Sequence, residues 1–142
     1  KVVLVQIMGT WCPNCLDESK YYTKFYENNK NKGLEIVALA FEYAKSKDKA
    51  FAAIKRLQDR VGIDYPILLA QYGTSNKDLA QEKLPMLNHV LSYPTTIFMD
   101  EKQQMLSPVP GYQKPQPFLK IAKYFGENIH KEKDWKTYDS GS

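Results

Sequence analysis

The chain has 142 residues, a formal net charge of +4, 43% hydrophobic residues and two cysteines. This length suits one domain with its own hydrophobic core, and the ordinary shares of charged and aromatic residues argue against global disorder. No stretch approaches the roughly 18 consecutive apolar residues of a membrane span. Two cysteines allow at most one internal disulfide, which excludes a multiply cross-linked scaffold. The positive charge comes mostly from scattered lysines, so the composition does not favour a nucleic-acid-binding protein.

Apolar runs that suit strands alternate with segments that suit helices. The predicted strands cover residues 1–8, 34–41, 65–69, 95–99 and 104–107. The predicted helices cover residues 13–29, 46–61, 77–83 and 118–129. The second strand is mostly apolar, which is typical of parallel pairing. A short polar turn between the last two strands indicates a hairpin. This order predicts an α/β fold with a central mixed sheet, right-handed crossovers and helices on both faces.

We expect one domain over residues 1–129, with an insertion at about 71–92 and a polar, solvated tail over 130–142. The insertion exceeds the usual length of a connection. Its apolar end includes Met86 and Leu87, which we expect either to form one wall of a substrate groove or to pack in the core. Because the chain opens directly on an apolar strand, we expect a longer protein whose preceding segment, such as a signal peptide or lipid anchor, is missing.

The segment Trp11-Cys12-Pro13-Asn14-Cys15 carries the strongest functional signal. Two cysteines separated by two residues at a helix start can form a disulfide with little backbone movement. Cys12 would lie at the helix N-terminus, where unpaired N–H groups and the helix dipole favour a thiolate. Cys15 would lie one turn further on, ready to attack a mixed disulfide formed by Cys12. Asn14 is uncharged, so we expect little extra stabilisation of the thiolate in the reduced form. We therefore expect the chain to act mainly as a reductase of partner disulfides.

Two other interpretations of the cysteine pair stay open from the residues alone. A structural zinc site would need two further ligands, and the only histidines, His89 and His130, lack the spacing of a zinc finger. A static disulfide would close a very short loop and would therefore contribute little to stability.

The motifs Gly9–Cys15 and Ser92–Thr96 resemble those of the thioredoxin superfamily. Within it, the chain is most similar to the TlpA/ResA-type thiol–disulfide oxidoreductases of bacterial extracytoplasmic spaces, over residues 1–128. The resemblance implies a thioredoxin-like fold, a protein-disulfide oxidoreductase without cofactor or metal, and a periplasmic or membrane-anchored location. It also implies two kinds of partner, which are proteins with disulfides and an upstream thiol donor of electrons. We expect a monomeric domain.

The resemblance also assigns a substrate-binding set, in which Pro94 is cis and faces the disulfide. Tyr93 would present backbone groups to an extended substrate segment, and Trp11 would offer a flat apolar contact. Pro13 and Thr95 complete this set. The alternative for Pro94 is an ordinary proline at the start of a strand.

Glu18 stands three residues after Cys15, where ResA-like proteins carry an acid close to the thiols. We therefore predict that Cys12, Cys15 and Glu18 are catalytic, with Glu18 handling a proton; the alternative is an exposed acid near the helix start. Many thioredoxins place a buried aspartate six residues before the first cysteine, but this chain has Gln6, which cannot take a proton. Glu42 is a weaker candidate for proton transfer, and its alternative is a solvated strand end.

Two other functions compete with disulfide exchange. A peroxiredoxin-like peroxide reductase would need a threonine and an arginine around an activated cysteine, and the first arginine of the chain is Arg56. A non-catalytic, redox-sensing protein-binding domain would carry the same cysteine pair without turnover.

Overall fold

The computed structural model describes residues 2–84, 92–100, 102, 105–110, 114–126, 131 and 134–140. Within these residues, five strands form one sheet in the order β3-β2-β1-β4-β5. The strands are β1 (Val2–Met8), β2 (Leu34–Phe41), β3 (Ile67–Gln71), β4 (Thr95–Asp100) and β5 (Met105–Pro110). β2 pairs in parallel with both β1 and β3, whereas β4 pairs antiparallel with β1 and β5. The predicted mixed sheet is confirmed.

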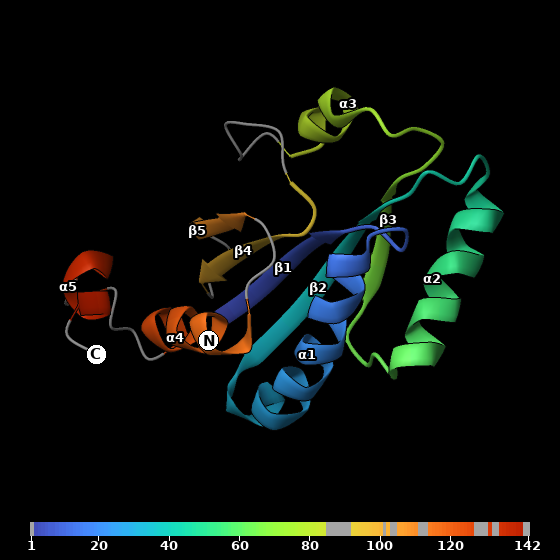
Figure 1. Ribbon diagram of the computed structural model, residues 1–142. Helices are drawn as coiled ribbons and strands as arrows, with labels where there is room; N and C mark the ends of the chain where they lie inside the picture. The colour runs from blue at the N-terminus through green and yellow to red at the C-terminus, as the bar shows by residue number, and fades with distance from the viewer. Residues whose placement is uncertain are drawn as a thin grey trace.

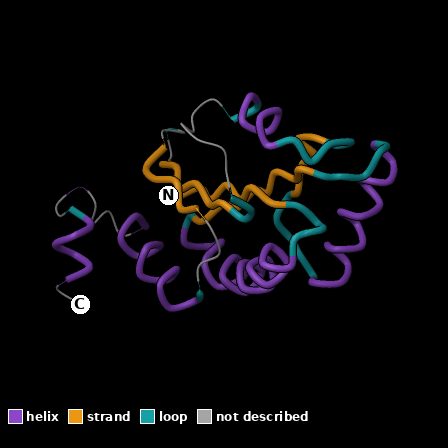
Figure 2. The backbone as a smooth tube through the Cα atoms, turned by 45° about the horizontal axis from the view of Figure 1, so that its top comes forward, coloured by secondary structure: helices purple, strands orange, loops and turns teal. Residues whose placement is uncertain are grey.

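Helices lie on both faces of this sheet, as predicted. They are α1 (Pro13–Asn29), the 3₁₀ turn η1 (Lys30–Lys32), α2 (Lys47–Val61), α3 (Lys77–Glu82), α4 (Pro115–Gly126) and α5 (Trp135–Ser140). β1, β2 and β3 are neighbours in the sheet in the same order as in the chain, so both crossovers lead towards the β3 edge of the sheet (Figure 1). Right-handed crossovers therefore place α1 and α2 on one face. Figure 2 shows α1, α2 and α4 on that face and α3 on the other.

None of the described helices has the length and apolar character that crossing a membrane requires.

Local sequence explains where α2 begins and ends. The Ser46 side chain accepts a hydrogen bond from the backbone N–H of Lys49 at 3.2 Å, which satisfies one of the free donors at the helix start. The helix ends at Gly62, whose φ of 79° is left-handed and favours glycine. These two residues fix the length of the helix that lies beside α1.

The sheet is buried on both faces because its central strand alternates between two hydrophobic clusters. Val2, Leu4 and Met8 of β1 belong to the larger cluster, which also contains buried residues of α1, α2 and α4. Ile7 belongs to the smaller cluster, together with Ala80 of α3. Burial on both faces explains why the strands are nearly continuous apolar runs.

Phe118 joins α4 to α1 and to the sheet. Its ring is 1% exposed, and aromatic rings from α1 and β4 surround it. The ring centroids lie at 5.3 Å from Tyr21, 5.0 Å from Tyr22, 5.2 Å from Phe25 and 6.0 Å from Phe98. Edge-to-face pairs such as those with Tyr21 and Phe25 add to the free energy of burial.

Several boundaries differ from the prediction. β3 begins at Ile67, two residues later than predicted. Pro66, directly before it, has no N–H to donate, although its carbonyl accepts a hydrogen bond from the Ala38 N–H of β2 at 2.9 Å. β5 and α4 are both longer at one end than the apolar pattern alone suggested. Residues 85–91, with Met86, Leu87 and His89, lie outside the described residues. The domain limits at 129 and the groove wall in the insertion therefore remain predictions.

The C-terminal tail contains α5, a short helix that the sequence pattern did not predict. Trp135 and Tyr138 lie against Tyr124 of α4, at centroid distances of 5.3 and 5.2 Å. An ion pair of 2.8 Å also joins Lys120 to Asp139. The helix is too short to show a periodic apolar stripe, which is why the sequence pattern did not reveal it.

Replacing Phe118 by Ala is expected to lower the free energy of unfolding by about 3–5 kcal/mol, because a buried ring is lost from a packed aromatic cluster. Urea denaturation measures this change. Leu119→Ala is the matched control, because Leu119 is 42% exposed on the same helix. Equal losses in the two variants would contradict the role given to Phe118.

Candidate active site

The parallel pairing of β1 and β2 brings the carboxyl ends of both strands to one edge of the sheet. The loop after β1 runs over residues 9–12 and leads directly into α1. Such an edge is where α/β folds carry their functional residues. The two cysteines stand here, at the start of α1.

Cys12 and Cys15 form a disulfide, and their Cα atoms are 5.2 Å apart. Cys12 is the N-cap of α1, Pro13 is its first residue, and the backbone N–H of Cys15 points to the Cys12 sulfur at 3.2 Å. Cys12 is 5% exposed and Cys15 is fully buried. An approaching sulfur therefore reaches Cys12 first, and a helix-start N–H stands ready to stabilise a thiolate there.

The end of β2 holds the loop that precedes Cys12. The backbone N–H of Thr10 donates to the Glu42 carboxylate at 2.8 Å, and the Thr10 hydroxyl donates to the other carboxylate oxygen. The indole N–H of Trp11 donates to the Phe41 carbonyl at 2.8 Å. Glu42 is 2% exposed, so the expectation of a solvated strand end is wrong. Its carboxylate instead fixes the backbone two residues before Cys12.

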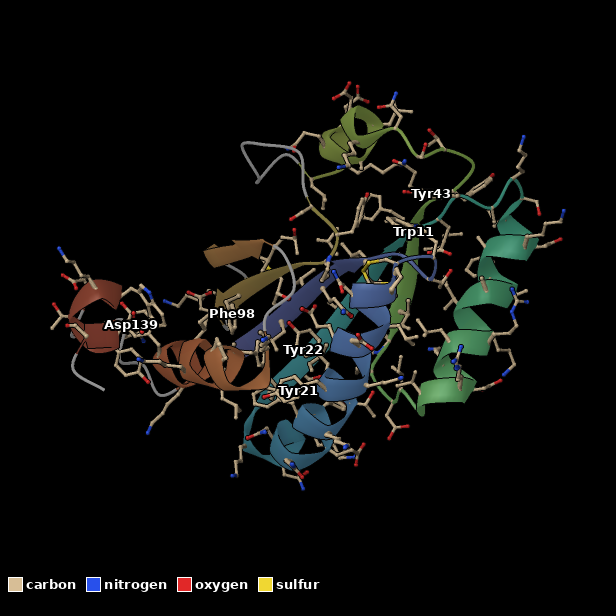
Figure 3. All side chains as sticks on the ribbon, viewed as in Figure 1. Trp11, Tyr21, Tyr22, Tyr43, Phe98 and Asp139 are labelled. Carbon is tan, nitrogen blue, oxygen red and sulfur yellow. A yellow bond between two sulfur atoms is a disulfide. The ribbon has the colours of Figure 1, made fainter. Side chains whose placement is uncertain are left out.

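Aromatic rings line this edge beside the disulfide. Trp11 stacks on Tyr43, with ring centroids 4.3 Å apart and planes 13° apart. Figure 3 labels both residues, near the yellow sulfurs. The ring of Tyr93 also meets that of Trp11, at an interplanar angle of 78° and with centroids 5.1 Å apart. Burial raises the pKa of Tyr93 to about 12, and the neighbouring Tyr43 adds to the effect. The phenol of Tyr93 therefore stays neutral at physiological pH, and the surface beside the disulfide is largely apolar.

The peptide bond between Tyr93 and Pro94 is cis, as the resemblance to the thioredoxin superfamily implied. Pro94 and Thr95 are buried at the start of β4. The Thr95 hydroxyl donates to the Ser92 carbonyl at 2.6 Å, so the side chain is used within its own loop. Because Tyr93 contacts Trp11, this loop lies at the same edge of the sheet as the two cysteines.

Behind the disulfide, Glu18 lies in a buried polar layer between α1 and the sheet. It is 1% exposed, so the alternative of an exposed acid is wrong. The Gln6 side-chain amide donates to Glu18 Oε1 at 3.1 Å, and the Thr96 hydroxyl donates to the same oxygen at 3.4 Å. The Tyr22 hydroxyl bonds to that of Thr96. Burial first, and then the charge of Glu18, raise the pKa of Tyr22 well above its usual value.

The described residues contain no group of three His, Cys, Asp or Glu side chains able to hold a metal ion. The two histidines considered as zinc ligands, His89 and His130, lie outside the described residues.

Residues 1–114 match the Redoxin family. The chain belongs to the Redoxin family. Among curated proteins, this Redoxin-family chain is 26% identical over 123 residues to the thiol-disulfide oxidoreductase ResA of Bacillus thuringiensis subsp. konkukian (strain 97-27). That similarity covers 87% of the chain and 62% of the relative, so the chain spans only part of the relative's length. The expected resemblance to ResA-like members of the thioredoxin superfamily is confirmed.

Solved structures show the same fold. A thioredoxin-family thiol:disulfide interchange protein from Chlorobium tepidum TLS superposes with a TM-score of 0.66 at 20% identity, covering 87% of this chain and 78% of that one. A secreted Mycobacterium tuberculosis disulfide oxidoreductase, homologous to E. coli DsbE, superposes with a TM-score of 0.60 at 15% identity, covering 84% and 77%. The predicted thioredoxin-like fold is confirmed.

Sequence reasoning missed the structural role of Glu42. A signal for it was present, because an acid directly follows an apolar strand predicted to lie in parallel beside the strand that leads to Cys12. Two such strand ends meet at one edge of a sheet. What the pattern did not reveal is that the acid turns inward to the loop instead of outward to water.

Gly9→Ala is expected to displace the Trp11 indole, because a Cβ at position 9 would lie 2.1 Å from Trp11 Nε1. The indole would lose its hydrogen bond to Phe41, and Trp11 fluorescence would shift towards that of a solvated indole. The measurement needs a Trp135→Phe background, in which Trp11 is the sole tryptophan. An unchanged emission spectrum would contradict the packing of the indole against Gly9.

Proposed function

We propose that this chain is a protein-disulfide oxidoreductase that reduces disulfides of partner proteins through Cys12 and Cys15. The observation that carries the proposal is the pairing of a slightly exposed Cys12 at the α1 N-terminus with a fully buried Cys15. The Cys15 N–H already points to the Cys12 sulfur. In this arrangement, Cys12 attacks the partner disulfide and Cys15 attacks the mixed disulfide that results.

The reaction consists of two exchanges of one sulfur for another. The Cys12 thiolate attacks one sulfur of the partner disulfide, forms a mixed disulfide and releases the partner's other sulfur as a thiolate. Cys15, once deprotonated, attacks the Cys12 sulfur and releases the second partner thiolate. The partner gains two electrons and two protons, while the chain returns to the Cys12–Cys15 disulfide. An upstream dithiol then donates two electrons to regenerate the reduced pair.

Five residues around the sulfurs are proposed to bind the partner. Trp11 supplies an apolar face, Pro13 is exposed at the start of α1, and Tyr93, Pro94 and Thr95 offer backbone groups to an extended segment. Because Pro94 has no N–H and the Thr95 hydroxyl already bonds within its loop, recognition at this loop rests on the backbone. Backbone recognition suits a protein that reduces more than one partner sequence.

Glu18 is proposed to exchange a proton with the cysteine pair. Its carboxylate is buried one helical turn after Cys15, where the low dielectric strengthens its influence on a neighbouring thiol. Gln6 holds one carboxylate oxygen by a hydrogen bond and so keeps the acid in place. The proton-handling group therefore stands on the helix in this chain, where many thioredoxins carry it on the strand.

An extracytoplasmic location is proposed together with this activity. The support is the similarity to ResA and the fold shared with a secreted disulfide oxidoreductase. The proposed net direction is reduction, since the residues between the cysteines include no charge that would specially stabilise the thiolate.

The Cys15→Ala variant is expected to hold partner proteins covalently on Cys12, because the second exchange cannot occur. Mass spectrometry of the trapped adducts would identify the partners. The Cys12→Ala/Cys15→Ala variant should trap none. In the wild type, dithiothreitol-driven reduction of insulin should proceed well above background; a rate at background would indicate a redox sensor instead of an exchanger.

Glu18→Gln is expected to lower the pKa of the reduced cysteine pair, since a buried negative charge that disfavours the thiolate is removed. The ultraviolet absorbance of the thiolate against pH measures this shift, and the rate of insulin reduction should lose part of its pH dependence. Asp17→Asn is the matched control, because Asp17 is the exposed neighbour on the same helix. If both variants titrate like the wild type, Glu18 does not act on the thiols.

A further inference from the structure

Two adjoining hollows of about 290 Å³ each lie beside the cysteine loop. The first is lined by Trp11, Tyr43 and the start of α2, and the second by Leu16 of α1 and the middle of α2. Both include Thr10 and Arg56 in their walls. We call the two together the α2 groove; it begins one residue from Cys12 and continues between α1 and α2.

The α2 groove is basic. Lys49, Arg56 and Arg60 line it, all three from α2, at spacings that place them on one face of the helix. They are exposed, and none forms an ion pair with a carboxylate of the described residues. Glu42 is the one acid among the lining residues, but it is buried and accepts the hydrogen bonds of Thr10.

Both arginines of the chain lie in this groove, although lysines are far more numerous elsewhere. Arginine presents a planar fork that binds a carboxylate through two hydrogen bonds, whereas lysine acts as a point charge. Arg56 and Arg60 are one helical turn apart, about 6 Å along α2. Carboxylates two residues apart in an extended chain are separated by about 6.6 Å and so match this spacing.

From this charge and position, we propose that the α2 groove binds an acidic stretch of the partner protein that adjoins the disulfide to be reduced. The inference rests on the proposed function, because the partner's cysteine must sit at Cys12 when its acidic stretch enters the groove. Trp11 and Tyr43 form the apolar wall nearest the cysteine, and Arg56 and Arg60 receive carboxylates further along. The groove thus favours partners that carry acidic residues beside their cysteines.

The test compares two synthetic disulfide peptides, one with Asp and Glu beside the cysteine and one with Asn and Gln at those positions. The reduced wild type should reduce the acidic peptide about fivefold faster than the amide peptide at low salt, and the advantage should shrink as salt is raised. Arg56→Gln/Arg60→Gln should remove the advantage and leave reduction of the amide peptide unchanged.

The control is Lys24→Gln/Lys55→Gln, which makes the same change in net charge at exposed positions outside the groove. If this variant loses the advantage as fully as the arginine variant does, the effect is one of overall charge and the proposal is overturned. If the arginine variant slows reduction of oxidised glutathione as much as that of the acidic peptide, the groove is a site for small anions and the proposal is also overturned.

A binding measurement separates this inference from the proposed function. The Cys12→Ser/Cys15→Ser variant should bind a cysteine-free acidic peptide, detected as a change in Trp11 fluorescence in the Trp135→Phe background. Adding Arg56→Gln/Arg60→Gln should weaken that binding about fivefold. Failure of the wild type to reduce either peptide would refute the oxidoreductase, whereas absence of this binding would refute the groove.

Discussion

The position of the Cys12 sulfur depends on the hydrogen bonds that join the cysteine loop to the end of β2. Glu42 accepts from the backbone and the hydroxyl of Thr10, and the Phe41 carbonyl accepts from the Trp11 indole. Bonds to an ionised carboxylate are stronger than those between neutral groups, and here they are shielded from water. A loop held in this way presents Cys12 at the helix start without requiring a partner to order it.

A second polar layer lies behind the sulfurs, between α1 and the sheet. In it, the side-chain amide of Gln6 from β1 donates to the buried Glu18 carboxylate of α1. Thr96 donates to the same Glu18 oxygen as Gln6, and Tyr22 bonds to Thr96, so one oxygen of the buried carboxylate accepts two hydrogen bonds. Burying a charge is costly unless it is hydrogen-bonded, which explains why these polar residues lie together between α1 and the sheet.

The aromatic and basic surfaces adjoin at the cysteine loop. Tyr93 and Tyr43 both contact Trp11, and Trp11 and Tyr43 line the start of the α2 groove. Arg56 lines both hollows of the groove, and Arg60 lines the second. Under the two proposals, a partner chain that crosses this edge would be recognised through its backbone at the loop over residues 93–95, through an apolar contact at Trp11 and through its negative charge at the α2 groove.

The sequence alone determined the order of strands and helices, the mixed sheet and the redox pair, because these depend on local apolar patterns and on the short spacing of Cys12 and Cys15. The prediction that Glu18 handles a proton came from family resemblance and not from the local pattern. The tertiary structure decided that Glu18 and Glu42 are buried, since burial depends on residues distant in the chain, such as Gln6 and Thr10. It also decided that Arg56 lines the same hollow as Trp11, because only the packing of α2 beside the cysteine loop brings the two residues together.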